Sequence, residues 1–237
     1  MRGGGHRRDL GGIPERGKPV IAVVDYGAGN VQSVVNALER IGVDARLTTD
    51  PAEIAGAAGV IVPGVGAARD TMRNLDAAGL VEPLLAYIAS GRPYLGICMG
   101  MQALMTASEE HGGQECLNVI PGTARLLEVD LQVPHMGWNA VDLSLAGREH
   151  PLFAGIPDGA EFYFAHSFAC YPDDDDAVLA TTDYGAPFVS AVGRGAVMAV
   201  QFHPEKSGPN GLRLLANFAA LVEREAGVET RAGSGVA

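Results

Sequence analysis

The fold of this chain is decided by the stretch Pro93-Tyr94-Leu95-Gly96-Ile97-Cys98-Met99-Gly100-Met101-Gln102. A short apolar strand runs into a sharp turn, and the turn carries one cysteine between two glycines before a helix begins. This Gly-x-Cys-x-Gly pattern matches the nucleophile elbow motif, with cysteine in place of serine. The glycines are needed because the backbone of such a nucleophile is strained and must be approached closely. The pattern predicts a strand–turn–helix unit that presents a thiol.

Two properties of this predicted turn favour a reactive Cys98. The helix that follows, expected over residues 99–108, points its N-terminus at the sulfur and favours thiolate over thiol. The backbone N–H of Met99 is free to donate to an oxyanion. The alternative for Cys98 considered alone is a buried cysteine that packs as a small apolar side chain.

Length and composition fit one large α/β domain. The chain has 237 residues and a formal net charge of −11, which argues against nucleic acid as a partner. No run is apolar enough to span a bilayer, and the N-terminus lacks the apolar segment of a secretory signal. The three cysteines form no Cys-x-x-Cys pair, which suits a reducing cytoplasm and argues against disulfides or a zinc site. We expect a cytoplasmic protein with no metal or organic cofactor and no membrane partner.

The pattern along the chain divides it into three segments. Residues 1–18 are rich in Gly and Arg and are expected to be a disordered extension, and residues 227–237 a flexible tail. Residues 19–226 are expected to form a single domain. Its first half alternates β-branched runs with helical periods, and its second half reads as short strands separated by turns. The expected fold is α/β: an open, mostly parallel sheet flanked by helices, with additional antiparallel strands in the second half.

Two glycine-containing turns follow predicted strands in the first half. Gly27-x-Gly29 resembles part of a dinucleotide fingerprint, but the third glycine is missing and the signal is weak. Pro63-Gly64-Val65-Gly66 lies where open α/β sheets bind ligands, at the carboxyl end of a strand. Its backbone N–H groups are candidate second donors to an oxyanion, and an ordinary turn is the alternative.

A cysteine nucleophile needs a base, and the base needs a group that orients it. His203 ends the last apolar strand, and Glu205 follows two residues later, on the same side of an extended segment. We therefore expect Glu205 to accept from one ring nitrogen of His203. The alternative for His203 is a buried histidine that only forms hydrogen bonds with a neighbouring loop. Two further histidines in strand-like contexts, His135 and His166, are other possible bases.

The elbow with Gln102 and the downstream His203-Pro204-Glu205 together resemble the class I (triad) glutamine amidotransferases, which have a flavodoxin-like fold. Further stretches are similar to the glutaminase subunits of imidazole glycerol phosphate synthase, across roughly residues 19–225. These stretches are Asp25-Tyr26-Gly27-Ala28-Gly29-Asn30, Pro63-Gly64-Val65-Gly66, Pro134-His135-Met136-Gly137-Trp138-Asn139, Tyr163-Phe164-Ala165-His166-Ser167-Phe168 and His203-Pro204-Glu205-Lys206-Ser207.

This resemblance implies a role for each matching residue. Cys98 would attack the side-chain amide of L-glutamine, with His203 as the proton carrier and Glu205 orienting it, and the thioester would be hydrolysed to glutamate. The oxyanion would be held by the backbone N–H groups of Met99 and of Val65 and Gly66. The α-amino and α-carboxylate groups of glutamine would be held by a further set of residues: Gln102, Glu110, Ser167 and Phe168.

The resemblance also implies a partner, the cyclase subunit of imidazole glycerol phosphate synthase, a (β/α)₈ barrel that forms a heterodimer with the glutaminase and uses its ammonia in histidine biosynthesis. The residues implied at the docking face and the ammonia passage are Asn30, His135, Met136, Trp138, Tyr163 and Lys206. Trp138 is the only tryptophan and lies in a predicted Gly/Asn loop. Two roles remain open for it, an anchor of the interface and a residue of the buried core.

Other functions use similar residues. The chain could serve another amidotransferase, such as those of pyridoxal phosphate, purine or anthranilate synthesis, or be a non-catalytic regulatory subunit. Another class, such as a cysteine peptidase or a thiol redox sensor, could also use an elbow cysteine. The acidic run Asp173–Asp176 is expected to be a solvated hairpin tip rather than a metal site.

Overall fold

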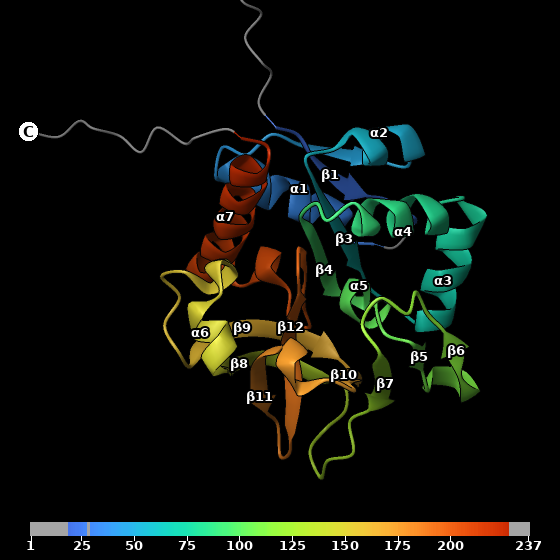
Figure 1. The fold of residues 1–237 in the computed structure, drawn as a ribbon. Helices are drawn as coiled ribbons and strands as arrows, with labels where there is room; N and C mark the ends of the chain where they lie inside the picture. Colours follow the sequence, from blue (N-terminus) through green and yellow to red (C-terminus); the bar gives the residue numbers. More distant parts are fainter. Residues whose placement is uncertain (1–18, 28, 228–237) are drawn as a thin grey trace, which may run out of the picture.

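The computed structural model describes residues 19–27 and 29–227 (Figure 1). The predicted N-terminal extension, residues 1–18, lies outside the described residues, as does the predicted C-terminal tail apart from Gly227.

The described chain forms a 13-stranded sheet with helices on both faces. The strands are β1 (Ile21–Val24), β2 (Ala45–Thr48), β3 (Gly59–Gly64), β4 (Tyr94–Cys98), β5 (Ala107–Ser108), β6 (Gln114–Glu115), β7 (Gly122–Leu126), β8 (His135–Leu143), β9 (Ala160–His166), β10 (Phe168–Pro172), β11 (Val178–Asp183), β12 (Pro187–Arg194) and β13 (Val197–Val200). The α-helices are α1 (Val31–Arg40), α2 (Pro51–Gly56), α3 (Ala68–Ala77), α4 (Val81–Ala89), α5 (Met99–Gln102), α6 (Leu145–Glu149) and α7 (Gly208–Glu225). The 3₁₀ turns are η1 (Glu110–Gly112), η2 (Pro151–Phe153), η3 (Asp175–Ala177) and η4 (Pro204–Lys206).

The strand order is β2-β1-β3-β4-β13-β12-β10-β7-β5-β6. Beside this path, β11 pairs with β12 and with β8, and β8 also pairs with β9. The five strands from β2 to β13 are all parallel. From β12 onward most pairs are antiparallel. The predicted fold class is confirmed: a parallel sheet with antiparallel strands added by the second half.

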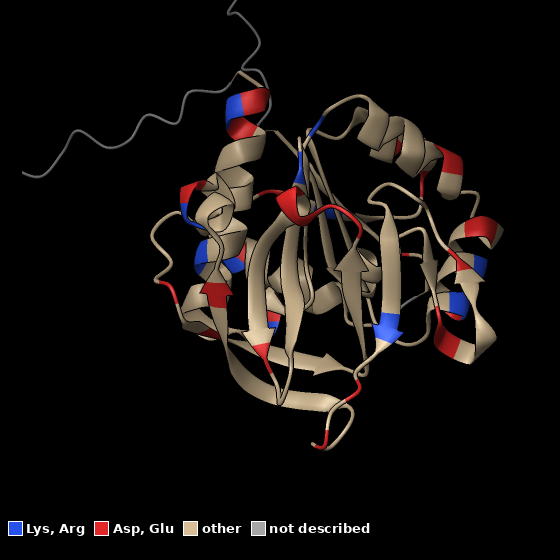
Figure 2. Ribbon diagram, turned by 60° about the horizontal axis from the view of Figure 1, so that its bottom comes forward, with Lys and Arg blue, Asp and Glu red and all other residues tan. Residues whose placement is uncertain are grey.

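Alternate residues of the parallel strands serve two cores, one on each face. Ile21 and Val23 of β1 face α1 and α7, whereas Ala22 and Val24 face α2, α3 and α4. Both faces are covered, so these strands read as continuous apolar runs rather than alternating ones. In Figure 2 the charged residues lie mainly on helices and loops around a largely uncharged sheet. No helix of the described part combines the length and apolarity needed to cross a bilayer.

The helix predicted after the elbow is shorter than expected. It was expected over residues 99–108, but α5 ends at Gln102 and β5 follows. The carbonyls beyond α5 accept from a later segment instead of from the helix: Ala103 from the N–H of Leu117, and Leu104 from those of Val119 and Ile120. A distant segment thus takes the hydrogen bonds that would have continued the helix.

Two other expectations differ from the structure, and one helix was not predicted at all. Asp173–Asp176 is not a hairpin tip, because β10 and β11 each pair with β12, which lies between them. Trp138 lies in the paired strand β8 rather than in a loop. Helix α3 was not predicted, since it buries only Ala68, Thr71 and Leu75 and its apolar period is faint.

Candidate active site

The site lies at the carboxyl ends of β1, β3, β4 and β13, the edge where open α/β sheets bind ligands. Cys98 ends β4, and Gly64 at the end of β3 is its register partner. This pairing places Val65 and Gly66 next to the elbow. His203 follows β13, the other neighbour of β4 in the sheet. Residues far apart in sequence therefore meet because their strands are parallel and adjacent.

Cys98 has the strained backbone that the elbow motif predicts. Its φ is 54° and its ψ −105°, an unfavourable conformation for a residue with a β-carbon. The residue is buried, with 4 % of its surface exposed. Such strain persists only where the surroundings over-determine it, and it is concentrated at functional sites.

The glycines around Cys98 are required by close packing. A β-carbon on Gly100 would overlap the carbonyl oxygen of Val62, and one on Gly96 would lie 2.6 Å from the carbonyl oxygen of Gly100. A β-carbon on Gly64 would overlap the Tyr26 hydroxyl. The elbow therefore sits against β3 with no room for a side chain at any of the three positions.

His203 and Glu205 form a buried pair. Nδ1 of His203 lies 2.9 Å from Oε1 of Glu205, and their side chains are 2 % and 0 % exposed. The same Oε1 accepts a hydrogen bond from the Asn30 side chain, at the N-terminus of α1. Asn30 was implied for the docking face; here it holds the carboxylate that faces His203.

The surroundings of His203 favour its protonated form. Burial lowers the pKa of His203, but the neighbouring Cys98 and Glu205 side chains outweigh burial and raise it to about 10. Nε2 of His203 is buried and has no hydrogen-bond partner among the described residues. The arrangement can hold an imidazolium beside the sulfur, with one N–H available to a reacting group.

A cavity of about 170 Å³ opens over Cys98. It is lined by all seven residues that the resemblance implied for the oxyanion hole and the substrate: Val65, Gly66, Met99, Gln102, Glu110, Ser167 and Phe168. Three further residues line the cavity and were not expected there, although one of them, His166, was considered as a possible base: Pro134, Ala165 and His166.

Two polar side chains of this cavity have defined partners. Oε2 of Glu110 accepts from the backbone N–H of Ala68 at 2.7 Å, which caps α3. Nε2 of Gln102 donates to the carbonyl of Phe168 at 3.0 Å. Oε1 of Gln102 is buried and has no partner among the described residues. The cavity thus offers the Glu110 carboxylate to a positively charged ligand, and the unpartnered oxygen of Gln102 lies buried in its wall.

Sequence comparison connects this geometry with known proteins. Residues 22–222 match the family "Glutamine amidotransferase class-I". The chain belongs to the class I glutamine amidotransferase family. Within it, the chain is 52 % identical over 200 residues to the imidazole glycerol phosphate synthase subunit HisH of Chloroflexus aurantiacus, covering 84 % of this chain and 94 % of the relative. It is 49 % identical over 206 residues to HisH of Syntrophotalea carbinolica, covering 84 % and 98 %. This amidotransferase is therefore a member of the HisH group.

Solved structures share the fold at lower sequence identity. The TM-score is 0.66 at 22 % identity for a protein from Thermoplasma acidophilum described as part of a GMP synthase, with 90 % of this chain and 99 % of that one covered. PurLQS from Thermotoga maritima aligns with a TM-score of 0.66 at 18 % identity, covering 86 % and 98 %. These likenesses concern the amidotransferase fold alone.

The residues implied for the docking face divide into exposed and buried ones. Met136 and Trp138 are 64 % and 53 % exposed on the outer face of β8. Tyr163, the register partner of Trp138 on β9, contacts its ring edge-on and lies under Nζ of Lys206. His135 does not lie on this surface: it is 2 % exposed, because alternate residues of β8 face inward.

His135 and His166 form a buried pair at the wall of the cavity, which His166 lines. Nδ1 of His166 donates to the carbonyl of Phe168 at 2.9 Å, which leaves its Nε2 as the acceptor for Nδ1 of His135 at 3.1 Å. Nε2 of His135 in turn accepts from Asn139 at 3.3 Å. The chain of bonds requires both rings to be neutral, because a second proton on either ring would place two donors against each other.

These two histidines predict a loss of stability in acid. Burial lowers the pKa of His135 and of His166 to about 4, whereas both titrate near 6.5 when unfolded. The unfolded chain therefore binds more protons at these two positions between about pH 6.5 and pH 4, so their contribution lowers the free energy of unfolding as the pH falls through this window and adds no pH dependence above it. At pH 5 the penalty is up to about 2 kcal/mol for each histidine.

Urea unfolding at pH 7 and pH 5 measures this effect. The His135→Gln/His166→Gln double variant should lose less stability between the two pH values than the native chain. His111→Gln, at an exposed histidine, is the matched control and should behave as the native chain does. An unchanged pH dependence in the double variant would contradict the assignment.

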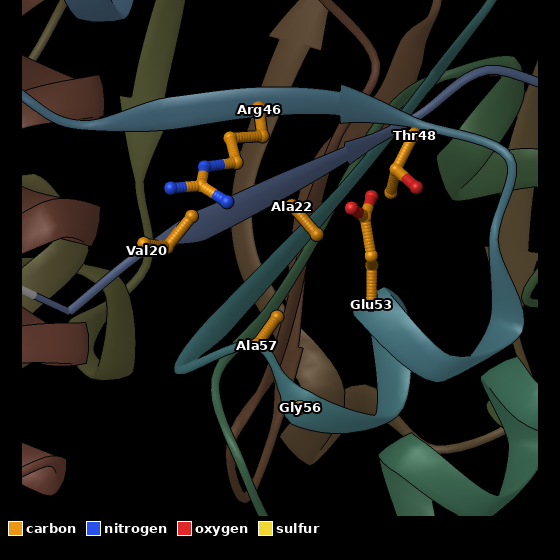
Figure 3. A pocket seen from close by; sticks show the side chains of 7 residues that line it. All are labelled: Val20, Ala22, Arg46, Thr48, Glu53, Gly56 and Ala57. Atoms are coloured by element: carbon orange, nitrogen blue, oxygen red, sulfur yellow. The ribbon is translucent and has the colours of Figure 1, made fainter.

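A separate cavity of about 240 Å³ lies between β1, β2 and α2 (Figure 3). Arg46 of β2 and Glu53 of α2 extend into the same space, over Ala22 and Ala57. It shares no residue with the Cys98 cavity. Among the described residues, no group of three or more His, Cys, Asp or Glu is placed to hold a metal ion.

Proposed function

We propose that this chain hydrolyses L-glutamine to glutamate and ammonia with Cys98 as nucleophile. One observation carries the proposal: a strained cysteine on the floor of a cavity, beside a buried His203–Glu205 pair. A nucleophile, a base and a group that orients the base are the parts needed for acyl transfer through a covalent intermediate.

The reaction proceeds in two halves. The Cys98 sulfur, its proton passed to His203, attacks the amide carbon of the glutamine side chain, and the carbonyl oxygen becomes an oxyanion. The C–N bond then breaks as Nε2 of His203 gives its proton to the departing nitrogen, which releases ammonia and leaves a γ-glutamyl thioester on Cys98. Water, deprotonated by the now neutral His203, attacks the thioester and releases glutamate. Glu205, held by Asn30, keeps the ring in place and stabilises the imidazolium.

The oxyanion is held by the backbone N–H groups of Met99 and of the Val65–Gly66 segment. Their position around Cys98 in the cavity supports this assignment. One such donor contributes about 10²–10³ in rate. We propose that a misaligned Val65–Gly66 segment keeps the free chain nearly inactive and that partner docking realigns it.

Gly66→Ala tests the oxyanion segment. Gly66 has a φ of +97°, and no atom of the described residues lies within 4 Å of an added β-carbon, so the change strains only the backbone. We expect glutaminase activity in the complex to fall about 10- to 100-fold as the donors move. Gly79→Ala is the control, because Gly79 also has positive φ (+65°) and open space but lies at the end of α3. Equal activity of the two variants would contradict the assignment.

We propose that the ammonia passes to the cyclase subunit of imidazole glycerol phosphate synthase in a heterodimer that serves histidine biosynthesis. The relatives named HisH are subunits of that synthase. The exposed Met136 and Trp138, together with Tyr163 and Lys206, form an apolar and aromatic surface suited to a protein partner. Ammonia must avoid bulk water, so this surface should close over the exit of the Cys98 cavity.

Trp138→Ala is expected to weaken cyclase binding at least tenfold, because tryptophan is one of the residues that most often anchor the centre of an interface. Leu145→Ala is the control, since Leu145 is 85 % exposed on α6, beyond the end of β8. Titration calorimetry with the purified cyclase measures both. Equal loss, or no loss at Trp138, would place the interface elsewhere.

Glutamate release from L-glutamine tests the function as a whole. The chain alone should release almost no glutamate, and the cyclase subunit with its nucleotide ligand should raise the rate strongly. Glutaminase activity that is the same with and without the cyclase would indicate that the chain serves another amidotransferase. An absence of glutamate under all these conditions would contradict the proposal and favour a non-catalytic role.

A further inference from the structure

Gln201, the first residue after β13, has a fully buried side chain that contacts both the thiol and the cavity wall. Its Nε2 donates to Sγ of Cys98 at 3.5 Å, and its Oε1 accepts from Nε2 of Gln102 at 3.2 Å. Its backbone N–H donates to the carbonyl of Ser190 at 2.9 Å, which fixes the residue beside β12. One side chain thus bridges the nucleophile and Gln102.

The direction of these hydrogen bonds follows from one backbone group. The carbonyl of Phe168 can only accept, so Gln102 must turn its amide nitrogen toward it. The second hydrogen of that nitrogen then points at Gln201, whose side-chain oxygen accepts it. The nitrogen of Gln201 is consequently the atom that faces the sulfur of Cys98.

This order has a consequence at each end of the chain of bonds. Both N–H groups of Gln102 are used, so its Oε1 is left as a buried acceptor in the cavity, without a partner among the described residues. A ligand N–H or ammonium group that reaches this oxygen would satisfy it. At the other end, an N–H donor stabilises a thiolate more than a thiol, because hydrogen bonds to charged groups are the stronger ones.

We propose that Gln201 is a positioning residue for the glutaminase reaction: it orients the amide of Gln102 toward the substrate and donates a hydrogen bond to the Cys98 sulfur. The inference rests on the proposed function for its link to glutamine. The contact with Cys98 stands on the geometry alone and is tested separately below.

Two variants separate the two contacts. Gln201→Glu, when ionised, keeps an oxygen for Gln102, has no donor for Cys98 and adds a negative charge beside the sulfur. Gln201→Met fills a similar volume with neither group. For Gln201→Glu we expect kcat in the cyclase complex to fall about 10- to 100-fold with KM for glutamine nearly unchanged. For Gln201→Met we expect the same fall in kcat and a KM raised about tenfold, because Gln102 is free to turn.

The rate of Cys98 alkylation by iodoacetamide at neutral pH, without glutamine, is the second readout. It should fall about tenfold in both variants. Ser190→Ala is the matched control: the residue is equally buried and its backbone carbonyl accepts from Gln201, but its hydroxyl has no partner in the described structure, so removing the hydroxyl should change neither readout. Circular dichroism and thermal unfolding show whether each variant folds. If the methionine variant does not fold, the isosteric glutamate variant carries the test.

Kinetic constants and alkylation rates within about twofold of the native values in the folded variants would overturn the proposal. So would an equal rise of KM in Gln201→Glu and Gln201→Met. If the native chain releases no glutamate, the proposed function fails, and slower alkylation of Cys98 in the variants still supports the contact with Gln201. Unchanged alkylation would in that case overturn it.

Discussion

Replacing Cys98 with alanine is expected to lower glutamate release by at least about 10⁴-fold, because the thioester cannot form without the sulfur. The cavity, the proposed oxyanion donors and the His203–Glu205 pair all remain, so the variant should still bind glutamine and the cyclase. The measurement is glutamate release at saturating glutamine in the assembled complex, with complex formation checked by titration calorimetry.

Cys116→Ala is the matched control for this prediction. Cys116 is a free cysteine outside the cavity, and burial raises the pKa of its thiol to about 11, which keeps it protonated. Its replacement should leave activity within about twofold. Retention of more than about one hundredth of the native activity by Cys98→Ala would remove the covalent mechanism.

Gly100→Ala is expected to destabilise the fold by about 3 kcal/mol and to abolish activity in whatever fraction folds. The added β-carbon would overlap the carbonyl of Val62, which is held within the central strand β3. Backbone on both sides must move, and the elbow would move with it. Urea unfolding followed by circular dichroism measures the free energy, and iodoacetamide labelling reports the exposure of Cys98.

Gly56→Ala gives the comparison for the same change of side chain. Gly56 ends α2, and within the described part of the chain no atom lies within 4 Å of an added β-carbon. Because alanine lowers the entropy of the unfolded chain, the substitution should be neutral or slightly stabilising. Similar unfolding free energies for the two variants would mean that the elbow is not packed as tightly as described.

The elbow was predictable from sequence because its chemistry is local. A β-branched or apolar strand, two glycines and one cysteine follow each other without interruption, and the strain of Cys98 is implied by its neighbours. The pairing of His203 with Glu205 was predictable for the same reason, since the residues lie two apart. Residues predicted at the carboxyl ends of parallel strands could also be expected to lie close together, because these ends share one edge of the sheet.

Contacts between distant segments were not predictable in this way. Asn30 reaches Glu205 across 175 residues, and only the parallel order of β1, β3, β4 and β13 brings them together. The length of α5 depends on hydrogen bonds from residues 117–120, and the helix propensity of the local sequence does not indicate these bonds. Gln201 stands two residues before His203, but its contact with Cys98 depends on a register that the sequence does not state.

The central claim is that Cys98 is the nucleophile of a glutamine-shaped cavity, and labelling with an electrophilic diazoketone analogue of L-glutamine tests it most directly. Intact mass and peptide mapping should find one adduct, on Cys98, formed more slowly when L-glutamine is present. Cys116 and Cys170 should remain unmodified. An adduct on either of those cysteines, or labelling of Cys98 that glutamine does not slow, would contradict the account.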